Sequence, residues 1–403
     1  MTADAGPGAL LPIEVATGVV FGAAATPALV EPNPGDTPIA ALERACLPAL
    51  RRAPCLVSFS GGVDSSLVLA AATRAAQREG LPLPIPATNR FPLADGTDEN
   101  EWQGLVVSSL GLTDWVRLEL TDELDAIGPV AMRGLRRHGL LWPFNAHFHA
   151  PLLEMAKGGS LLTGIGGDEL FGVPRFARAY DVVSGHVRPR PRDIMRVALW
   201  ASPQPLRRAL IARRMPVKLP WLRPAAHAQF ARLWAADQAA EPARLDSRVR
   251  HLHAGRPFRV GLASLDRLAR DAGASIAHPL AAPAFGLSVA AAAPGRGFEW
   301  RGAAIRELFG GLLPVELLSR TTKACFDSAF WGPHSRAFAL RWDGEGVDPS
   351  VVDVERLRAI WAHPLPDPHT YLLLQAARLA QGGESMKKGF LAGRPVVSAT
   401  EPS

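Results

Sequence analysis

The stretch from Leu56 to Leu69, LVSFSGGVDSSLVL, limits what this chain can fold into more than any other part of it. It opens with a short apolar run that is partly β-branched, which predicts a buried strand. Two glycines and several small polar residues follow, and a helical pattern then runs from Leu67 towards Gly80. A strand, a glycine turn and a helix start in this order predict an anion site, because backbone N–H groups and the positive end of the helix dipole face one ligand.

The turn between this strand and this helix carries the groups that we expect to contact a phosphate. A carboxylate also lies here, Asp64, and it would repel a phosphate unless a cation stands between them, for which Mg²⁺ is the simplest choice. The alternative is an ordinary β–α turn in which Asp64 and the serines only cap the helix. No Gly-Lys-Ser/Thr of a Walker A loop is present in this stretch. The phosphate-binding groups expected here are Ser60, Gly61, Gly62, Ser65 and Ser66.

A second glycine turn lies in the stretch from Ser160 to Gly172, SLLTGIGGDELFG, again after a short apolar run. The first turn, SGGVDSS, resembles the pyrophosphate loop of the ATP pyrophosphatases that form AMP. The second resembles the second signature of the synthetase domain in the asparagine synthetase family. This resemblance covers roughly Leu42 to Phe330.

The resemblance implies ATP and Mg²⁺ as cofactors, with Asp64 and Asp168 holding the ion on the pyrophosphate of ATP. The physical interpretation agrees, because two carboxylates at the ends of different strands can share one cation. Taken alone, Asp168 could instead be an acid favoured by the dipole at a helix start. Further nucleotide contacts are expected from Thr163, Gly164, Gly166 and Gly167.

A third element, RTTKACF from Arg320 to Phe326, is similar to a family element whose lysine reaches the α-phosphate. It implies a catalytic role for Lys323, and the alternative is an exposed lysine after a helix. The element is one residue longer between Arg320 and Lys323 than in the family pattern, which leaves the role of Arg320 open.

The chain departs from asparagine synthetases where those enzymes handle their substrates. Ile165 stands where they have a glutamate and β-lactam-forming relatives a tyrosine, so it can be neither acid nor base. The stretch from His278 to Ala281 lacks the aspartate of their substrate element. The glutaminase nucleophile, a cysteine after the start methionine, is replaced by Thr2, and the first predicted helix begins at Thr37. We therefore expect no glutaminase activity and an acid larger than aspartate.

A general base would have to come from elsewhere, and nearby candidates have structural alternatives. His147 and His149 flank Phe148 before the second glycine turn, but structural or solvent-facing roles are favoured for both. Asp98, after the second predicted strand, is expected either near the nucleotide or as a helix cap.

Composition narrows the class of protein. The 403 residues suit two domains, and a hydrophobic content of 48% allows a sizeable core. The net charge of +6 comes mostly from arginine, without a basic run interleaved with aromatic residues, so no nucleic-acid partner is expected. The 3 cysteines form no C-x-x-C pair, which argues against a zinc site. Without a membrane-length apolar run or a secretory signal, we expect no membrane partner and a cytoplasmic location.

Strands alternating with helices predict an α/β fold with a parallel sheet, and the resemblance implies the adenine-nucleotide α-hydrolase-like (PP-loop) type. We expect residues 1–36 to be a loose N-terminal segment, with 13–21 a strand or an apolar anchor. Residues 37–180 are predicted to be the ATP-binding α/β domain, 181–380 a mainly helical substrate-binding part, and 381–403 a flexible tail. Helices are expected over 121–138, 225–236, 262–271, 285–292, 303–309 and 366–380.

The resemblance implies an ATP-dependent carbon–nitrogen ligase that forms AMP and diphosphate through an acyl-adenylate. Lasso-peptide macrolactam cyclases are the most similar subgroup, which would make a precursor peptide the substrate and leave room for a separate partner protein. One alternative is an asparagine synthetase that receives ammonia from a separate source. An alternative of another class is a PP-loop enzyme that modifies tRNA, although the paired cysteines or RNA-binding appendage of such enzymes are not visible.

Overall fold

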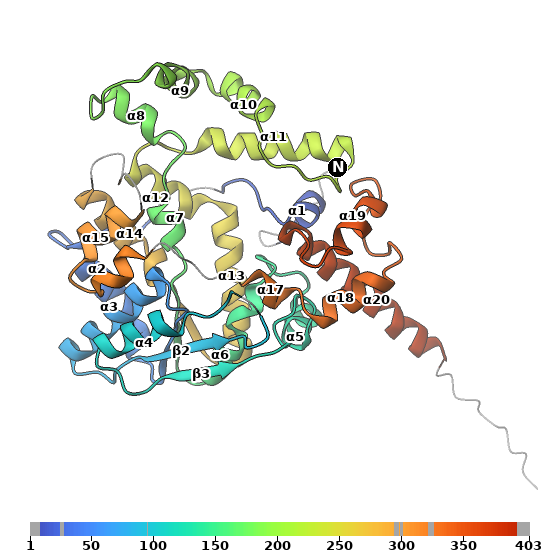
Figure 1. Ribbon diagram of the computed structural model, residues 1–403, viewed down its shortest axis with the longest axis horizontal. Coiled ribbons are helices and arrows are strands. Elements are labelled where there is room, and N and C mark those ends of the chain that lie inside the picture. The colour runs from blue at the N-terminus through green and yellow to red at the C-terminus, as the bar shows by residue number, and fades with distance from the viewer. Residues whose placement is uncertain are drawn as a thin grey trace, which may run out of the picture.

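A computed structural model of the chain shows a five-stranded, fully parallel sheet surrounded by helices (Figure 1). It describes residues 9–24, 28–94, 96–293, 298, 301–320 and 326–392, of which 383–392 are described by their backbone alone. The sheet confirms the predicted α/β fold. In the order β3-β2-β1-β4-β5, the strands are β3 (Val116–Glu119), β2 (Ile85–Arg90), β1 (Cys55–Ser58), β4 (Ser160–Leu162) and β5 (Ser275–Ala277).

The strand order reverses between β1 and β4, which lie side by side in the middle of the sheet. The chain passes from β1 outward to β2 and β3, then returns to place β4 on the other side of β1. The two strands are in register, with Leu56 opposite Leu161 and Val57 opposite Leu162. In open parallel sheets, ligands bind beyond the carboxyl ends of the strands at such a reversal. The two glycine turns of the sequence follow β1 and β4, so both lie at this place.

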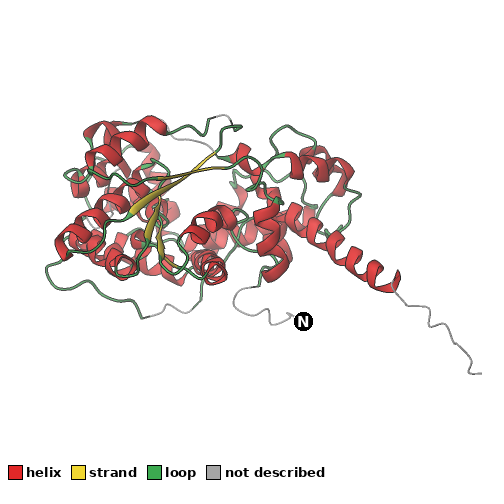
Figure 2. Ribbon diagram, turned by 90° about the horizontal axis from the view of Figure 1, so that it is seen from below, coloured by secondary structure: helices red, strands yellow, loops and turns green. Residues whose placement is uncertain are grey.

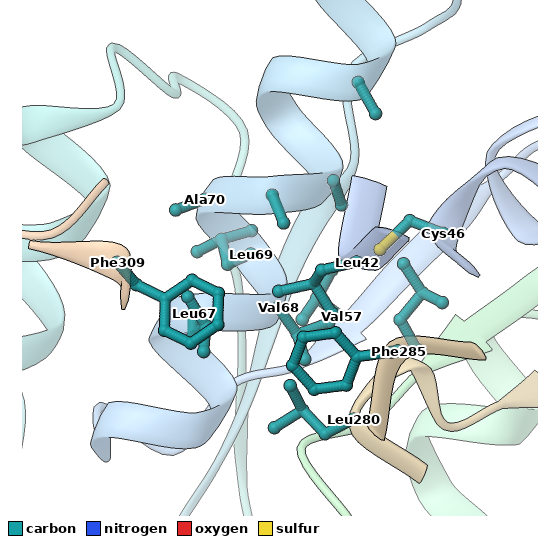
Figure 3. Close-up of a cluster of buried hydrophobic side chains, with 14 of the residues drawn as sticks. Leu42, Cys46, Val57, Leu67, Val68, Leu69, Ala70, Leu280, Phe285 and Phe309 are labelled. Atoms are coloured by element: carbon teal, nitrogen blue, oxygen red, sulfur yellow. The ribbon is translucent and has the colours of Figure 1, made fainter. Parts of the chain in front are cut away.

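Side chains alternate across β1, and each face of the sheet has its own core. Val57 packs with Leu42 of α2 (Pro38–Leu50), Leu67 of α3 (Val63–Glu79) and Phe285 of α14 (Pro283–Ala292), all fully buried (Figure 3). The neighbouring Leu56 belongs to a second core, on α6 (Ala150–Met155) and α13 (Arg256–Ala272). Because β1 is buried on both faces, its sequence is continuously apolar up to Ser58.

The other helices connect the strands or lie farther along the chain, after Phe171. Those connecting the strands are α4 (Asn100–Ser109), α5 (Pro129–His138), η1 (Ala146–His149) and α7 (Gly167–Phe171). The C-terminal half adds α8 (Ala177–Val183), α9 (Pro191–Ala201), α10 (Gln204–Arg213), α11 (Pro224–Ala240), α12 (Leu245–Ala254), η2 (Pro279–Ala281), α15 (Arg301–Phe309), α16 (Val315–Ser319), α17 (Asp327–Phe330), α18 (Pro333–Arg341), α19 (Val354–Trp361), η3 (Pro368–Thr370) and α20 (Tyr371–Ala392). Helices expected over 225–236, 262–271, 285–292 and 303–309 are present as α11, α13, α14 and α15.

Residues 13–21 form the apolar anchor, the second of the two alternatives for this segment. α1 (Pro12–Thr17) overlaps this range, and Ile13 and Phe21 are buried in a core shared with Trp221 and Tyr371. Residues 13–21 of the segment expected to be loose are therefore packed, because their apolar side chains cover α11 and α20, whereas none of residues 28–36 is buried.

One further expectation differs from the structure. The helix expected over 121–138 begins only at Pro129, because the buried Asp125 holds the preceding turn through bonds from Ile127 N and from Ser335, far along the chain. The part expected to be mainly helical consists mostly of helices and also supplies β5 to the sheet. Where the tail is expected to begin, at 381, α20 continues as far as Ala392, and this helix projects from the body (Figure 2). The predicted domain boundaries stay predictions.

In the described part of the chain, no helix is both long and apolar enough to cross a membrane.

The N-terminal anchor is fixed by a buried ion pair whose contribution can be measured. Glu14 is fully buried, pairs with Arg256 of α13, and accepts bonds from the backbone N of Leu11 (2.8 Å) and Phe21 (3.1 Å). Replacing it by Glu14→Ala should lower the free energy of unfolding by about 3–5 kcal/mol, because Arg256 then keeps a charge without its partner. Urea denaturation measures this loss.

The matched control is Glu31→Ala. Glu31 also pairs with an arginine, Arg250, at 2.9 Å, but its side chain is 59% exposed. Its loss should cost less than about 1 kcal/mol. Equal losses in the two variants would contradict the anchoring role of Glu14.

Candidate active site

The turns after β1 and β4 touch each other at the edge of the sheet. A Cβ atom added to Gly167 would lie 2.4 Å from Oδ1 of Asp64, and one added to Gly164 would lie 2.9 Å from the backbone N of Ser65. Any side chain at either glycine would therefore separate the start of α7 from the start of α3. The small residues of the second turn bring two helix N-termini together, and both direct N–H groups at the space above the sheet.

A cavity of about 480 Å³ opens above the two turns. This volume is within the usual range for small-molecule sites. Of the predicted site residues, those that line it are Ser60, Gly62, Asp64, Ser65, Gly164, Gly166 and Asp168. The structure adds lining residues that the sequence did not single out for this place, including Glu99 and Arg301.

Arg301, the first residue of α15, connects the two predicted metal ligands. One guanidinium nitrogen pairs with Oδ1 of Asp64 and another with Oδ1 of Asp168. The two carboxylates therefore converge on a single cationic group inside the cavity. Sequence reasoning missed Arg301, because nothing local distinguishes it among the 44 lysines and arginines of the chain.

The arrangement around Arg301 fits a magnesium ion bound together with a nucleotide. Mg²⁺ is usually held by one or two carboxylates, with phosphate oxygens and water completing its shell. Asp64 and Asp168 supply such a pair, and the guanidinium between them stands where a cation is required. The described ranges contain no cluster of three or more His, Cys, Asp or Glu suited to a metal.

The remaining predicted contacts divide into groups that face the cavity and groups used within the turns. Ser60 and Ser65 have their hydroxyls 3.2 Å apart at the cavity wall. The Ser66 hydroxyl is buried and donates to the carbonyl of Gly62 at 2.9 Å. Thr163 is buried with its hydroxyl 2.6 Å from Nδ1 of His278. Gly61, at a φ of +83°, packs against Gln103 of α4. Ser65 Oγ also donates to the carbonyl of Gly62, at 3.0 Å, so the first turn uses this hydroxyl as well. Ser66 and Thr163 therefore only shape the turns, whereas Ser60 and Ser65 also line the cavity.

A buried ion pair forms another part of the cavity wall. Glu99 and Arg320 have side chains that are 4% and 6% exposed, and both guanidinium NH2 groups contact the carboxylate. Glu99, not Asp98, therefore reaches the cavity, while Asp98 accepts a bond from the backbone N of Asn100 at 2.8 Å as a cap of α4. The predicted Lys323 lies outside the described residues. The nearest described residues on either side of it, Arg320 and Phe326, both line the cavity.

The structure separates the two histidines around Phe148. His147 is buried, with Nε2 3.0 Å from the carbonyl of Leu124, and burial lowers its pKa, so its role is structural. His149 lines the cavity, and its Nδ1 lies 3.1 Å from Oγ of Ser58 at the end of β1. Burial lowers the pKa of His149 to about 4, so the ring is neutral at pH 7.

The stretch from His278 to Ala281, which lacks the aspartate of the family's substrate element, lies against the second turn. The backbone N of Ala281 would be 2.6 Å from a Cβ added to Gly166. Burial, with the nearby His149 as a smaller cause, lowers the pKa of His278 to about 3. With Thr163 on Nδ1, this neutral ring holds the end of β5 to the end of β4.

A second cavity, of about 350 Å³, adjoins the first. Phe148, His149, Ile165 and Glu169 line both cavities and form their junction. Ile165 thus lies between the nucleotide-sized cavity and the second cavity. Family members with an acid or a base at this position would have that group at the same junction. No acid–base group is available at residue 165 in this chain.

Comparison with known proteins assigns the family. Residues 41–378 match the sequence model of asparagine synthase, which covers most of the chain. A search among curated proteins found no match. The matched range contains both glycine turns, Arg301 and the Arg320–Phe326 element, and it indicates an ATP-dependent ligase that acts on a carboxylate and an amine. The chain therefore belongs to the asparagine synthase family.

Proposed function

We propose that this protein joins a carboxylic acid to an amine through an acyl-adenylate, with ATP converted to AMP and diphosphate. The observation that carries the proposal is the convergence of Asp64 and Asp168 on one cation, in a cavity at the reversal of a parallel sheet. Family membership supports the general class of ATP-dependent ligase. The resemblance of SGGVDSS to AMP-forming loops supports attack at the α-phosphate.

The reaction has two balanced steps. A carboxylate oxygen attacks the α-phosphorus of ATP, the bond to the bridging oxygen breaks, and diphosphate leaves as the acyl-adenylate forms. An amine nitrogen then attacks the acyl carbon, the bond to the AMP oxygen breaks, and the nitrogen passes a proton to solvent water as the amide and AMP separate. Catalysis in this scheme depends on positioning and on stabilising negative charge that leaves with diphosphate.

The residues of the cavity have distinct roles in this scheme. Asp64 and Asp168 would hold the metal ion, and the chemistry that Mg²⁺ would supply when bound is neutralisation of charge on the diphosphate. Arg301, whose guanidinium contacts one oxygen of each carboxylate, would exchange these two partners for phosphate oxygens. Ser60, Ser65 and the N–H groups at the start of α3 position the phosphates. Lys323 is proposed to neutralise charge at the α-phosphate.

The natural substrate is proposed to be bulkier than aspartate, as in peptide macrolactam formation of the lasso type or another specialised ligation. Ile165 favours apolar contact at the junction of the two cavities and offers no proton acceptor. An amine tethered to the acid within one bound molecule needs less assistance, because its effective concentration is high. A precursor peptide, with or without a separate partner protein, meets this requirement.

The carboxylate pair gives the first functional test. Asp64→Asn and Asp168→Asn should each reduce acid-dependent AMP formation by at least about a hundredfold, because the neutral amides no longer hold the cation on the diphosphate. Asp114→Asn, in an exposed turn after α4, serves as control and should retain full activity. Full turnover by either cavity variant, at unchanged stability, would refute the proposed metal site.

The nucleotide products give the second test. Incubation with ATP, a panel of carboxylic acids and hydroxylamine as a small amine should yield AMP, diphosphate and the acyl hydroxamate in equal amounts. Chromatography of the nucleotides and a colour reaction for the hydroxamate measure them. ADP and orthophosphate as the main products would contradict adenylation.

Substrate size gives the third test. Aspartate with ammonia should give little diphosphate, whereas a peptide with a free N-terminus and an internal aspartate or glutamate should give more, together with a product lighter by one water. Mass spectrometry detects that product. Asparagine formation at roughly one to a thousand turnovers per second would instead identify an asparagine synthetase supplied with ammonia.

A further inference from the structure

The second cavity has an apolar and well-fixed wall. Trp142 forms one side, and its two N–H groups are already used, Nε1 by the carbonyl of Gly18 at 3.0 Å and the backbone N by Ser264 Oγ at 3.2 Å. The indole therefore presents only its ring to the cavity. It rests on the backbone of α13, since a Cβ added to Gly261 would lie 3.2 Å from Cζ3 of Trp142. Phe258 and Leu262 of α13 continue the apolar surface.

The lining of the second cavity carries negative charge and no positive charge. Among the residues that line the cavity, all within the described chain, Glu169 is the only one that carries a formal charge at neutral pH. No lysine or arginine is present to receive a carboxylate. The cavity is thus unsuited to the α-carboxylate of a free amino acid, and its only charged group attracts a cation.

Glu169 lies close to the nucleotide-sized cavity, where the reaction is proposed to occur. It follows Asp168 in α7 and lies at the junction, where the lining of the apolar cavity meets that of the nucleotide-sized cavity. The other residues of the junction are Phe148, His149 and Ile165. A ligand whose body fills the apolar cavity therefore has its end group beside one carboxylate and beside no cation of the lining.

We propose that this cavity binds the amine component of the reaction: its apolar body, of the size of one aromatic or branched aliphatic side chain, lies between Trp142 and Leu262, and its ammonium group faces Glu169. The assignment rests on the ligase function proposed above and names the chemical class of the amine. An ammonium ion held at the junction passes one proton to solvent water, to which Glu169 is exposed, and the neutral amine then reaches the acyl-adenylate from the side of Ile165. The same chemistry is offered by a free aryl- or alkylamine and by the N-terminus of a peptide with an apolar first residue.

The test is a binding measurement with probes that share one body and differ in their end group. Dissociation constants of 2-phenylethylamine, 2-phenylethanol and 3-phenylpropanoate are measured by NMR titration on the full-length protein, without ATP. The amine should bind about tenfold more tightly than the acid, with the alcohol between them, because Glu169 attracts one end group and repels the other. Equal or tighter binding of the acid would overturn the proposal.

Two variants locate the bound probes. Leu262→Trp should weaken all of the probes at least about tenfold by filling the cavity, whereas Ala263→Trp, at the adjacent exposed position of α13, should leave them unchanged. Glu169 is exposed, so Glu169→Gln should fold normally, and it should weaken only the amine, by about fivefold. Should Leu262→Trp fail to fold, as judged by circular dichroism, Glu169→Gln decides alone. Unchanged amine affinity in Glu169→Gln, or in folded Leu262→Trp, would overturn the assignment.

A further titration, with a peptide as the probe, distinguishes a free amine from a peptide N-terminus as the source of the amine. Phenylalanyl-glycine amide carries the same apolar body beside a peptide N-terminus, and tight, Leu262→Trp-sensitive binding of either amine supports the assignment and identifies its source. No ATP or acid is present in these titrations, so their failure counts against the cavity assignment alone. Absence of AMP formation with every acid of the panel would count against the ligase function alone.

Discussion

The contact between the turn after β1 and the turn after β4 is the constraint on which the rest of the site depends. Gly167 leaves room for the carboxylate of Asp64, so the N-termini of α3 and α7 meet above one edge of the sheet. The parallel register of β1 and β4 places these turns at the same height. Strand length, turn composition and sheet order thus combine to direct N–H groups and two carboxylates into one cavity.

The charged side chains in this cavity suit a cation and an anion that are bound together. Asp64 and Asp168 would repel each other without a positive group between them, and in this structure Arg301 occupies that position. A metal-bound polyphosphate satisfies both carboxylates and the guanidinium at once, because it offers a cation to the former and oxygens to the latter. The buried Glu99–Arg320 pair is different, because its two charges neutralise each other, and it forms part of the cavity wall.

Local patterns in the sequence were sufficient for the first four strands, the glycine turns and the longer helices, because each depends on a few neighbouring residues. Features that depend on distant partners were not predictable in this way. Arg301 becomes important only through its contact with Asp64, and the late start of α5 depends on the bond between Asp125 and Ser335. β5 is too short for a periodic signal, and His149 differs from His147 only by which side of η1 faces the cavity. The role of Lys323 stays a prediction, as it lies outside the described residues.

In the proposed reaction, the two adjacent cavities form one path: adenylation takes place above the glycine turns, and the amine enters past Ile165. Its central claim is that the acid is activated on the α-phosphate of ATP. The most direct measurement uses the acid of the panel that releases most AMP, labelled with ¹⁸O in its carboxylate, followed by mass spectrometry of the spent nucleotide and phosphate. We expect one ¹⁸O atom in AMP and none in diphosphate. Finding ¹⁸O in orthophosphate, accompanied by ADP, would contradict activation on the α-phosphate.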